Sequence, residues 1–377
     1  ITSFCMSLSN GKNDKEFDLK IAYLAHWDAS RESGVLKKIH MQARAWTSLG
    51  NTAGLFFLST QETLWPGLAD LYAEAVARGR IIDRPQRARL LTEHILQWKP
   101  DCVYMRLSTY YPAFEQLMKV CPTFLELNDS DRFDYHIGAT WWKELYQKVT
   151  TPRLLTLAKG LVYIAQDFAE RTTQPHIPNL VLGNGVELER YPELPPHCGA
   201  RPRLVFLGDP PASRDPLLNF MAHDKILFLA SQFPQWDFDL IGMRNQDFVE
   251  KLPENVKAHG YLTQEQYEPI LETGDIGIGV LGLHRKGLNE ASPIKVREYL
   301  AYGLPVISGH PDTDFLGGRP FLLELPNHEN NVRDALLEIE QFVLAWKGKR
   351  VKREELQHIS CNEKEAKKLQ FIRDHLR

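Results

Sequence analysis

The sequence predicts an α/β protein with two domains, each built on a parallel sheet that is covered by helices, with the two sheets facing a central cleft. Three observations support this fold class. The chain has 377 residues, which is too long for one ordinary hydrophobic core. Short apolar runs alternate with stretches of helical pattern, which is typical of parallel sheets buried on both faces. This pattern stops at a proline-rich segment, residues 191–202, and then starts again.

The first series of apolar runs predicts an N-terminal domain over residues 19–190. Helices are expected between several of the strands, including residues 35–49 and 90–98. Residues 1–18 are polar at their start and are expected to form a flexible tail. The expected strands are residues 21–25, 54–58, 102–105, 123–127, 161–165 and 180–182.

The second series predicts a C-terminal domain over residues 203–348. Residues 349–377 follow as a helical segment that ends in a charged amphipathic helix. Helices are also expected at residues 224–232, 264–272 and 293–302. The expected strands are residues 204–207, 238–241, 256–258, 276–280 and 306–308.

Composition and charge exclude several classes of protein. The net charge is −3, so nothing in the overall charge indicates nucleic acid as a partner. The longest apolar runs, residues 21–27 and 53–58, are far shorter than the roughly 18 residues of a membrane span. The five cysteines are scattered and include no Cys-x-x-Cys pair, which argues against a disulfide framework or a zinc site. We therefore expect a protein of a reducing compartment, the cytoplasm.

The strongest chemical signal lies in residues 273–309, where a strand, a glycine-bearing loop and a helix follow one another. Ser292 is a good N-cap and Pro293 suits the first helical position, while Gly303 is expected to end the helix. The free amides of this helix start, at Ser292 and Ile294, are expected to bind a diphosphate. Lys295 lies in the first turn, where the helix dipole disfavours a cation unless an anion is bound.

Two glutamates flank this helix start. Glu298 lies nearly two turns into the helix, within reach of a ribose whose phosphates occupy the helix start. Glu290 precedes the helix by a few residues and is expected to reach the hydroxyls of a sugar. An isolated pair of glutamates at this spacing is otherwise typical of a solvated helix face.

The spacing from Glu290 to Glu298 and the following residues, EYLAYGLPVISG, resemble the retaining GT-B glycosyltransferases of family 4. The resemblance implies two Rossmann-like domains, a donor sugar held by Glu290 and a nucleotide ribose held by Glu298. It covers residues 20 to about 345, and it implies a C-terminal helix that crosses back to the first domain. The sequence departs from the commonest family pattern, because Ala291-Ser292-Pro293 replaces the usual Phe-Gly.

Three further glycines carry the resemblance. Gly34 opens a helix after the first strand, as in the family's glycine loop, and the neighbouring Lys37 and Lys38 are expected to be solvated. Gly208 follows the first strand of the second domain, in a loop where Arg214 matches the family's arginine for the donor diphosphate. The family's lysine has no counterpart there, and Lys295, or alternatively Arg285 or Lys286, is expected to replace it. Gly260 matches a turn that the family places near the base.

The implied reaction is transfer of a sugar with retention at the anomeric carbon. Helix amides and the cations of Lys295 and Arg214 would stabilise the leaving nucleoside diphosphate. The family's chemistry implies no metal and no cofactor besides the nucleotide-sugar donor. The expected acceptor is a glycan, a lipid-linked molecule or a small molecule. The protein itself is expected in the cytoplasm, in solution or in peripheral contact with the inner face of a membrane. By position alone, the acceptor contacts are expected at Arg106, Asn128, Asp129 and Asp131.

Two alternatives remain open at this point. A nucleotide-sugar epimerase of the same fold would act on the donor alone. A non-catalytic nucleotide- or sugar-binding relative would explain the departures at Ala291 to Pro293 and the missing lysine. A dehydrogenase is disfavoured, because no G-x-G-x-x-G follows an expected strand.

Overall fold

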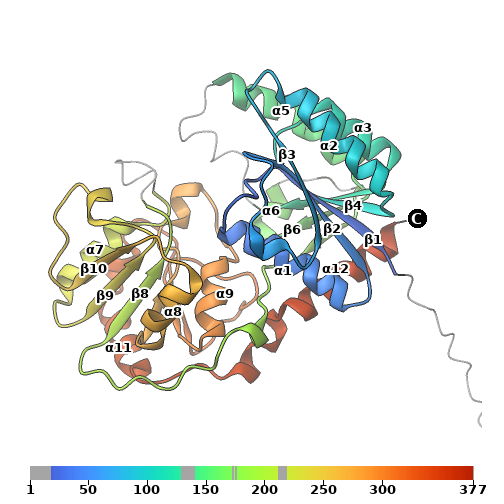
Figure 1. The fold of residues 1–377 in the computed structure, drawn as a ribbon. Helices are drawn as coiled ribbons and strands as arrows, with labels where there is room; N and C mark the ends of the chain where they lie inside the picture. Colours follow the sequence, from blue (N-terminus) through green and yellow to red (C-terminus); the bar gives the residue numbers. More distant parts are fainter. Residues whose placement is uncertain (1–17, 129–140, 172–173, 175, 211–218, 377) are drawn as a thin grey trace, which may run out of the picture.

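The structure is a computed structural model that describes residues 18–128, 141–171, 174, 176–210 and 219–376. It contains two Rossmann-like α/β domains, one around a seven-stranded sheet and one around a six-stranded sheet (Figure 1). This confirms the expected fold class. The expected tail at the N-terminus lies outside the described residues.

All strands of the first sheet are parallel, in the order β3-β2-β1-β4-β5-β6-β7. Helices connect most neighbouring strands, as the alternating pattern predicts. The elements are β1 (Lys20–Ala25), α1 (Gly34–Ser48), β2 (Thr52–Ser59), β3 (Tyr72–Ala77), α2 (Arg84–Trp98), β4 (Cys102–Arg106), α3 (Pro112–Val120), β5 (Thr123–Leu127), α5 (Trp141–Leu157), β6 (Gly160–Tyr163), α6 (Gln166–Arg171) and β7 (Asn179–Val181).

The second sheet is also parallel, in the order β10-β9-β8-β11-β12-β13. Its elements are β8 (Arg203–Leu207), α7 (His223–Gln232), β9 (Asp237–Ile241), β10 (Val256–Gly260), α8 (Gln264–Glu272), β11 (Ile276–Ile278), α9 (Ile294–Ala301), β12 (Val306–Ser308), β13 (Leu322–Glu324), α10 (Asn331–Asp334) and α11 (Leu336–Trp346). The 3-10 segment η6 (Arg353–Ile359) leads into the last helix, α12 (Cys361–His375).

Each sheet is buried on both faces because alternate residues of its strands enter different cores. In β1, Ala22 and Leu24 pack with α2, α3 and α5, whereas Ile21 and Tyr23 pack with α1 and α12. The second sheet divides in the same way, with α7 and α11 on one face and α8 and α9 on the other.

Two edge strands, β3 and β13, were not predicted from the sequence. β3 is YAEAVA, in which only Val76 is buried, so its hydrophobic signal is weak. β13 has only three residues. β3 is only partly buried, which explains its weak pattern, whereas β13 is very short.

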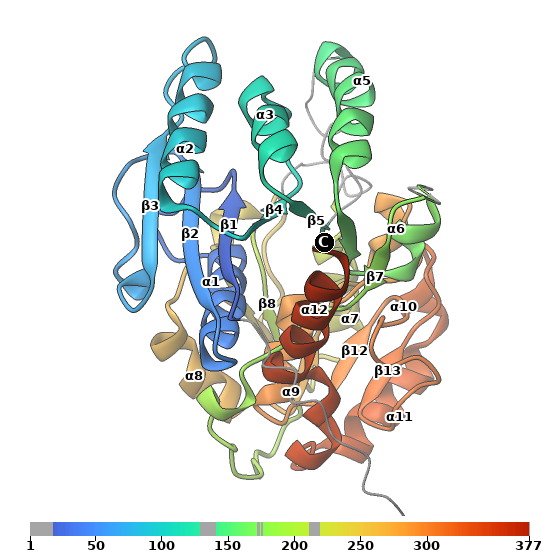
Figure 2. The same ribbon diagram turned by 90° about the vertical axis from the view of Figure 1, so that its right-hand side faces the viewer.

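The last helix lies against the first domain. α12 packs beside α1 (Figures 1 and 2), where the Trp46 indole donates a hydrogen bond of 2.7 Å to the Glu365 carboxylate. The chain just before α12 pairs with the segment that leaves the first domain, through bonds of 3.0 Å from the Val186 amide to Ile359 and 2.8 Å from the Cys361 amide to Val186. Two stretches of chain therefore join the domains side by side.

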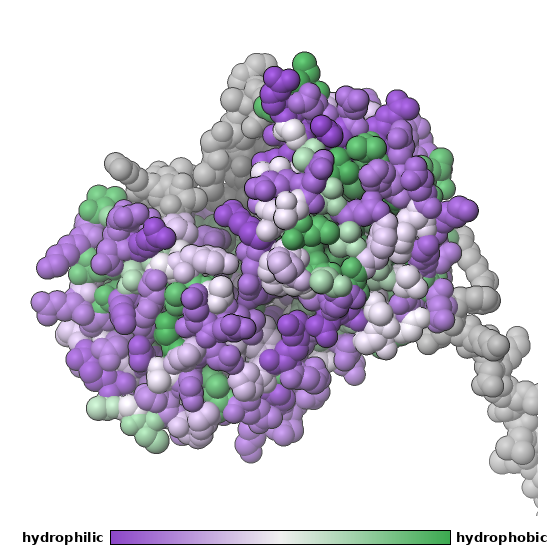
Figure 3. Space-filling model, in the orientation of Figure 1, coloured by the Kyte–Doolittle hydropathy of each residue, from purple (hydrophilic) through white to green (hydrophobic). Residues whose placement is uncertain are grey.

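The surface is predominantly polar. In Figure 3, hydrophilic residues cover most of this face, and hydrophobic residues form small groups between them. Within the described part of the chain, no helix combines the length and the apolar character needed to cross a membrane.

Candidate active site

Both sheets have a point at which the order of the strands reverses. In the first sheet it lies between β1 and β4, and in the second between β8 and β11. Ligands of open parallel sheets bind outside the carboxyl ends of the strands at such points. Gly34 begins the helix that follows β1, and Gly208 and Glu290 lie in the segments that follow β8 and β11.

The start of α1 is open and offers backbone donors. Ser33 caps the helix, with its hydroxyl 3.2 Å from the Leu36 amide. A Cβ on Gly34, the first helical residue, would meet no atom within 4 Å. The amides of Gly34 and Val35 have no acceptor among the described groups, so this helix start is free to bind an anion.

The loops after β8, β9 and β10 are packed together through glycines. The Gly242 amide donates to the Gly260 carbonyl at 2.8 Å, and a Cβ on Gly242 would lie 1.8 Å from the Gly208 carbonyl oxygen. Gly242 and Gly260 both have positive φ angles, 103° and 75°. These positions therefore have a conformational reason to be glycine, apart from any contact with a ligand.

Lys295 is a cation without an anionic partner, at the end of β8. Its Nζ lies 4.0 Å from the centre of the Phe206 ring, 3.1 Å from the Met221 sulfur, and 3.1 Å from the position of a Cβ built on Gly208. Burial lowers the pKa of Lys295 to about 7, and the charge of Asp209 opposes this only in part. No carboxylate of the described residues forms an ion pair with it.

Glu298 faces a contact between the two domains. Its carboxylate accepts a hydrogen bond from the Tyr267 hydroxyl of α8. Lys37 of α1 reaches the same hydroxyl from the first domain, with its Nζ at 3.4 Å, and also pairs with Glu32 at 2.9 Å. Burial raises the pKa of Glu298, while the charge of Lys37 and the Tyr267 hydrogen bond lower it. Lys37 is therefore not a free solvated side chain.

Glu290 lies at a second contact between the domains. Its carboxylate accepts a hydrogen bond from the Gln166 amide at the start of α6. The preceding residue, Asn289, donates from its backbone amide to Asp167 of the same helix at 2.9 Å. Arg171, at the end of α6, donates to the Gly287 carbonyl. The β11–α9 loop is thus held against the first domain, and Glu290 and Glu298 make different contacts across the domain boundary.

The start of α9 differs from the expected arrangement. The helix begins at Ile294 and Pro293 takes the N-cap position, so Ser292 is not the cap. The Ser292 hydroxyl is buried and accepts a hydrogen bond of 2.7 Å from the Asn184 amide of the first domain. The amides of Ile294 and Lys295 have no acceptor within the described part of the chain and remain available. Gly303, with φ 78°, ends the helix as expected.

Arg297 is an interaction centre that the sequence analysis missed. Its guanidinium is fully buried and pairs with Asp312 at 2.7 Å and Asp314 at 2.6 Å. It also donates to the Asn184 carbonyl at 2.9 Å, and Asp314 pairs with Lys364 of α12. Burial alone would lower the pKa of Arg297, but the two aspartates raise it. Arg297 therefore connects α9 to both stretches of chain that join the domains, directly through Asn184 and through Asp314 to Lys364.

The carboxyl end of the first sheet carries a buried ion cluster. Lys38, expected to be solvated, is only 3% exposed and pairs with Glu126 at 3.3 Å. The expectation that Lys38 is solvated was therefore wrong. Glu126 is far from Lys38 in the sequence, so no local pattern indicated this contact. The Arg106 guanidinium lies 3.8 Å from the Glu126 carboxylate, and the side-chain amide of Asn128 donates a hydrogen bond of 2.7 Å to the same carboxylate. Two of the expected acceptor contacts are thus brought together.

The remaining expected site residues are not placed by the structure. Arg214, Asp129 and Asp131 lie outside the described residues.

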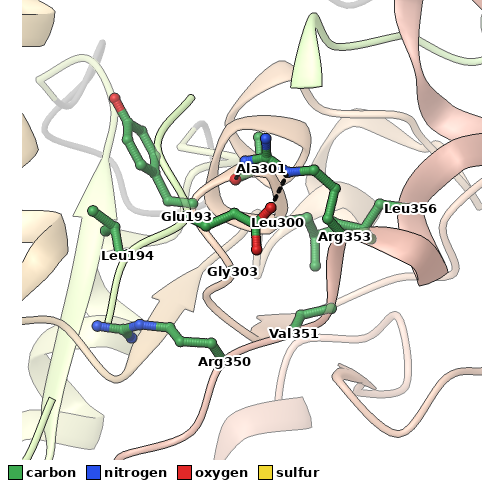
Figure 4. Close-up of a pocket in the computed structure, with 10 residues that line it drawn as sticks. Glu193, Leu194, Leu300, Ala301, Gly303, Arg350, Val351, Arg353 and Leu356 are labelled. Carbon is green, nitrogen blue, oxygen red and sulfur yellow. Dashed lines mark hydrogen bonds and ion pairs between the residues drawn. The ribbon is translucent and has the colours of Figure 1, made fainter. Parts of the chain in front are cut away.

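A small cavity lies behind α9, on the side of the linker. Its volume is about 40 Å³, enough for only a few water molecules. Figure 4 shows Glu193 and Arg353 facing one another across it, with an ion pair of 3.6 Å. It is lined by the carboxyl end of α9 and not by its start, so it is no candidate for a nucleotide site.

The architecture is the GT-B fold of glycosyltransferases. No protein-family model matches the chain, and no curated protein does so. Solved structures match over almost the whole length. A glycosyltransferase from Rickettsia africae is 14% identical, with a TM-score of 0.67 over 96% of this chain and 100% of that one. HepE from Anabaena in complex with UDP is 12% identical, with a TM-score of 0.62 over 94% of this chain and 100% of that one. WaaG, a glycosyltransferase involved in lipopolysaccharide biosynthesis, is 14% identical, with a TM-score of 0.61 over 93% and 99%. Identities this low show a common fold.

Proposed function

We propose that this protein is a retaining glycosyltransferase of family 4, which transfers a sugar from a nucleoside-diphosphate sugar to a glycan, lipid-linked or small-molecule acceptor. The observation that carries the proposal is Lys295. Within the described part of the chain, it is a cation without an ion pair beside two helix amides without an acceptor, at the point where the strand order of the second sheet reverses. A diphosphate supplies the missing negative charge at this position.

Each site residue takes a role from its place. Lys295 and the amides of Ile294 and Gly34 bind the diphosphate and stabilise the charge that develops as it leaves. Glu298 accepts hydrogen bonds from the ribose hydroxyls, which replace the hydrogen bond that it now accepts from Tyr267. Glu290 contacts the donor sugar from the β11–α9 loop, and Gly208 and Gly260 shape the loops around the nucleotide. Arg214 is proposed as a second cation for the diphosphate.

UDP is the first nucleotide to test, since the Anabaena neighbour is in complex with UDP. Thermal shift with UDP, GDP and dTDP should give a rise in melting temperature with one base in the wild type. The rise should be lost in Glu298→Ala and kept in Glu272→Ala, whose exposed carboxylate ends α8. No rise with any nucleotide would overturn the donor site.

Turnover separates the proposed reaction from its rivals. With the matching nucleotide sugar, a transferase gives a glycoside that keeps the donor's anomeric configuration, as read from the anomeric proton by NMR. A nucleotide-sugar epimer formed without acceptor would instead identify an epimerase. Binding of the donor with no turnover on any acceptor would identify a non-catalytic relative.

The proposed reaction uses no metal, because Lys295 and the helix amides can bind the diphosphate directly. The melting shift with UDP should then be the same with EDTA and with added Mg²⁺. A shift that requires Mg²⁺ would contradict this part of the proposal. The protein is proposed to work in the cytoplasm, in solution or in peripheral contact with the inner face of a membrane, which fractionation of cells expressing the full chain would test.

A further inference from the structure

Four side chains form a second polar group at the carboxyl edge of the first sheet, here called the edge cluster: His26, Arg78, Arg84 and Tyr111. His26 follows β1 and Arg78 follows β3, while Arg84 begins α2 and Tyr111 precedes α3. The rings of His26 and Tyr111 are in contact, with centroids 5.9 Å apart. Elements far apart in the sequence therefore meet here.

Among the described residues, the two arginines of the edge cluster have no anionic partner. Neither Arg78 nor Arg84 forms an ion pair within the described part of the chain, and the Nε of Arg84 is buried without a hydrogen-bond partner. The nearest acidic residue in sequence, Asp83, pairs instead with Arg80. A buried guanidinium nitrogen without an acceptor is costly, which indicates a ligand that supplies one.

The charges of Arg78 and Arg84 both affect the pKa of His26. Its pKa is lowered to about 4, first by burial and then by the charges of Arg78 and Arg84. Its Nε2 is also buried without a partner. Burial raises the pKa of Tyr111, and the charge of Arg84 and a side-chain hydrogen bond with Arg84 lower it. Both guanidinium charges therefore act on His26, whose ring contacts Tyr111.

The ion cluster at the end of β5 does not neutralise this region. Glu126 and Glu365 are balanced there by Lys38 and Lys368. Arg106 is then a further cation at the same edge, 3.8 Å from Glu126 and 5.8 Å from the centre of the Trp27 ring. Among these described residues, Arg106 is thus one cation more than the two carboxylates balance.

We infer that the acceptor carries a phosphate group, which binds in the edge cluster between Arg78 and Arg84. Guanidinium groups bind phosphate through paired hydrogen bonds, and a phosphate satisfies the buried Arg84 nitrogen. This inference rests on the proposed transferase function, because it assigns the acceptor to the first domain. It narrows the open choice of acceptor to phosphorylated molecules, either a soluble sugar phosphate or the phosphate of a lipid-linked molecule.

The test is phosphate binding, measured by calorimetry on the full-length protein saturated with UDP, which keeps the probe out of the donor site. Inorganic phosphate and glucose 6-phosphate are the soluble probes, with glucose as the uncharged control. Wild type should bind both phosphates. Arg78→Gln/Arg84→Gln should weaken binding about tenfold or more, because it removes both charged donors of hydrogen bonds to the phosphate.

Matched variants keep the result interpretable. Arg87→Gln, at an exposed arginine of α2, should bind phosphate like the wild type. Arg78→Lys/Arg84→Lys should recover part of the affinity, since it keeps the charge and loses the paired geometry. Equal losses in Arg87→Gln and in the double variant, or no phosphate binding by the wild type, would overturn the inference.

NMR of His26 provides a second readout that does not depend on affinity. Bound phosphate should raise the pKa of His26 from about 4, because it screens the two guanidinium charges. An unchanged His26 titration at saturating phosphate would mean that phosphate binds elsewhere, which also overturns the inference.

The two sources of phosphate are separated by sedimentation with vesicles. Binding to phosphatidylcholine vesicles that contain phosphatidylglycerol, lost in Arg78→Gln/Arg84→Gln, would support a lipid-linked phosphate. Binding of glucose 6-phosphate without vesicle binding would support a soluble acceptor. If UDP gives no thermal shift but phosphate still moves the His26 pKa, the proposed function fails and the anion site stands. A thermal shift with UDP but no binding of phosphate would support the proposed function and overturn the phosphate site.

Discussion

At the scale of single residues, Lys295 shows how a local charge is set by its surroundings. Its first-turn position is unfavourable for a cation, and packing against Phe206 and Met221 removes water without supplying an anion. The free protein therefore holds an ammonium group that loses its proton near pH 7. A bound diphosphate favours the charged form and raises this pKa.

The pH dependence of UDP binding follows from that difference. Above pH 7, binding should take up a proton at Lys295, so affinity should fall as the pH rises from about 7 towards the higher pKa of the complex. Calorimetry at pH 8 in buffers of different ionisation enthalpy measures the uptake. Lys295→Met should bind UDP more weakly and show no such uptake. The same uptake in this variant would place the titrating group elsewhere.

Arg297 is a residue whose loss should affect stability. Arg297→Ala leaves Asp312 and Asp314 buried without their cation, which should cost about 3 to 5 kcal/mol in the free energy of unfolding. Urea denaturation measures this. Lys257→Ala, at an exposed position of β10, should change it by less than about 0.5 kcal/mol. Similar stabilities for the two variants would contradict the central place given to Arg297.

At the scale of elements, α12 completes a domain that is distant in the sequence. Ile372 is fully buried among residues of α1 and the first sheet. Ile372→Ala should lower the free energy of unfolding by about 2 to 5 kcal/mol, because a cavity remains in that core. Denaturant unfolding checks this against Lys367→Ala, an exposed position of the same helix that should change little. Equal effects would mean that α12 is only loosely attached.

Helix α9 shows which features of an element were predictable. Its end at Gly303 was predicted because a positive φ after a helix is a local requirement that glycine meets. Its start was wrongly assigned because the Ser292 hydroxyl bonds to Asn184 rather than to its own helix. The central strands of both sheets were predicted because a strand that is buried on both faces is apolar throughout, which is also a local feature of the sequence.

At the scale of the whole molecule, the two joining stretches of chain make the domains depend on one another. The first sheet is covered on one face by α1 together with α12, which follows the second domain in the chain. Residues 19–190 alone would expose the surface around Trp46 that α12 covers. Such a fragment should melt at a lower temperature than the full chain, and a peptide of residues 349–377 added in trans should raise its melting temperature. No effect of the peptide would show that the first domain is stable by itself.

The sequence by itself determined the fold class, the two sheets and the segments near the proposed donor site. These follow from local causes: periodic apolar residues, helix ends, and loops at the carboxyl ends of strands. Only the tertiary structure decided the partners of the polar side chains. Lys38 meets Glu126, Glu298 meets Tyr267 and Lys37, and Arg297 meets two aspartates and Asn184. These partners come from other elements, and the cost of burying a charge without a partner selects them once the sheets and helices have packed.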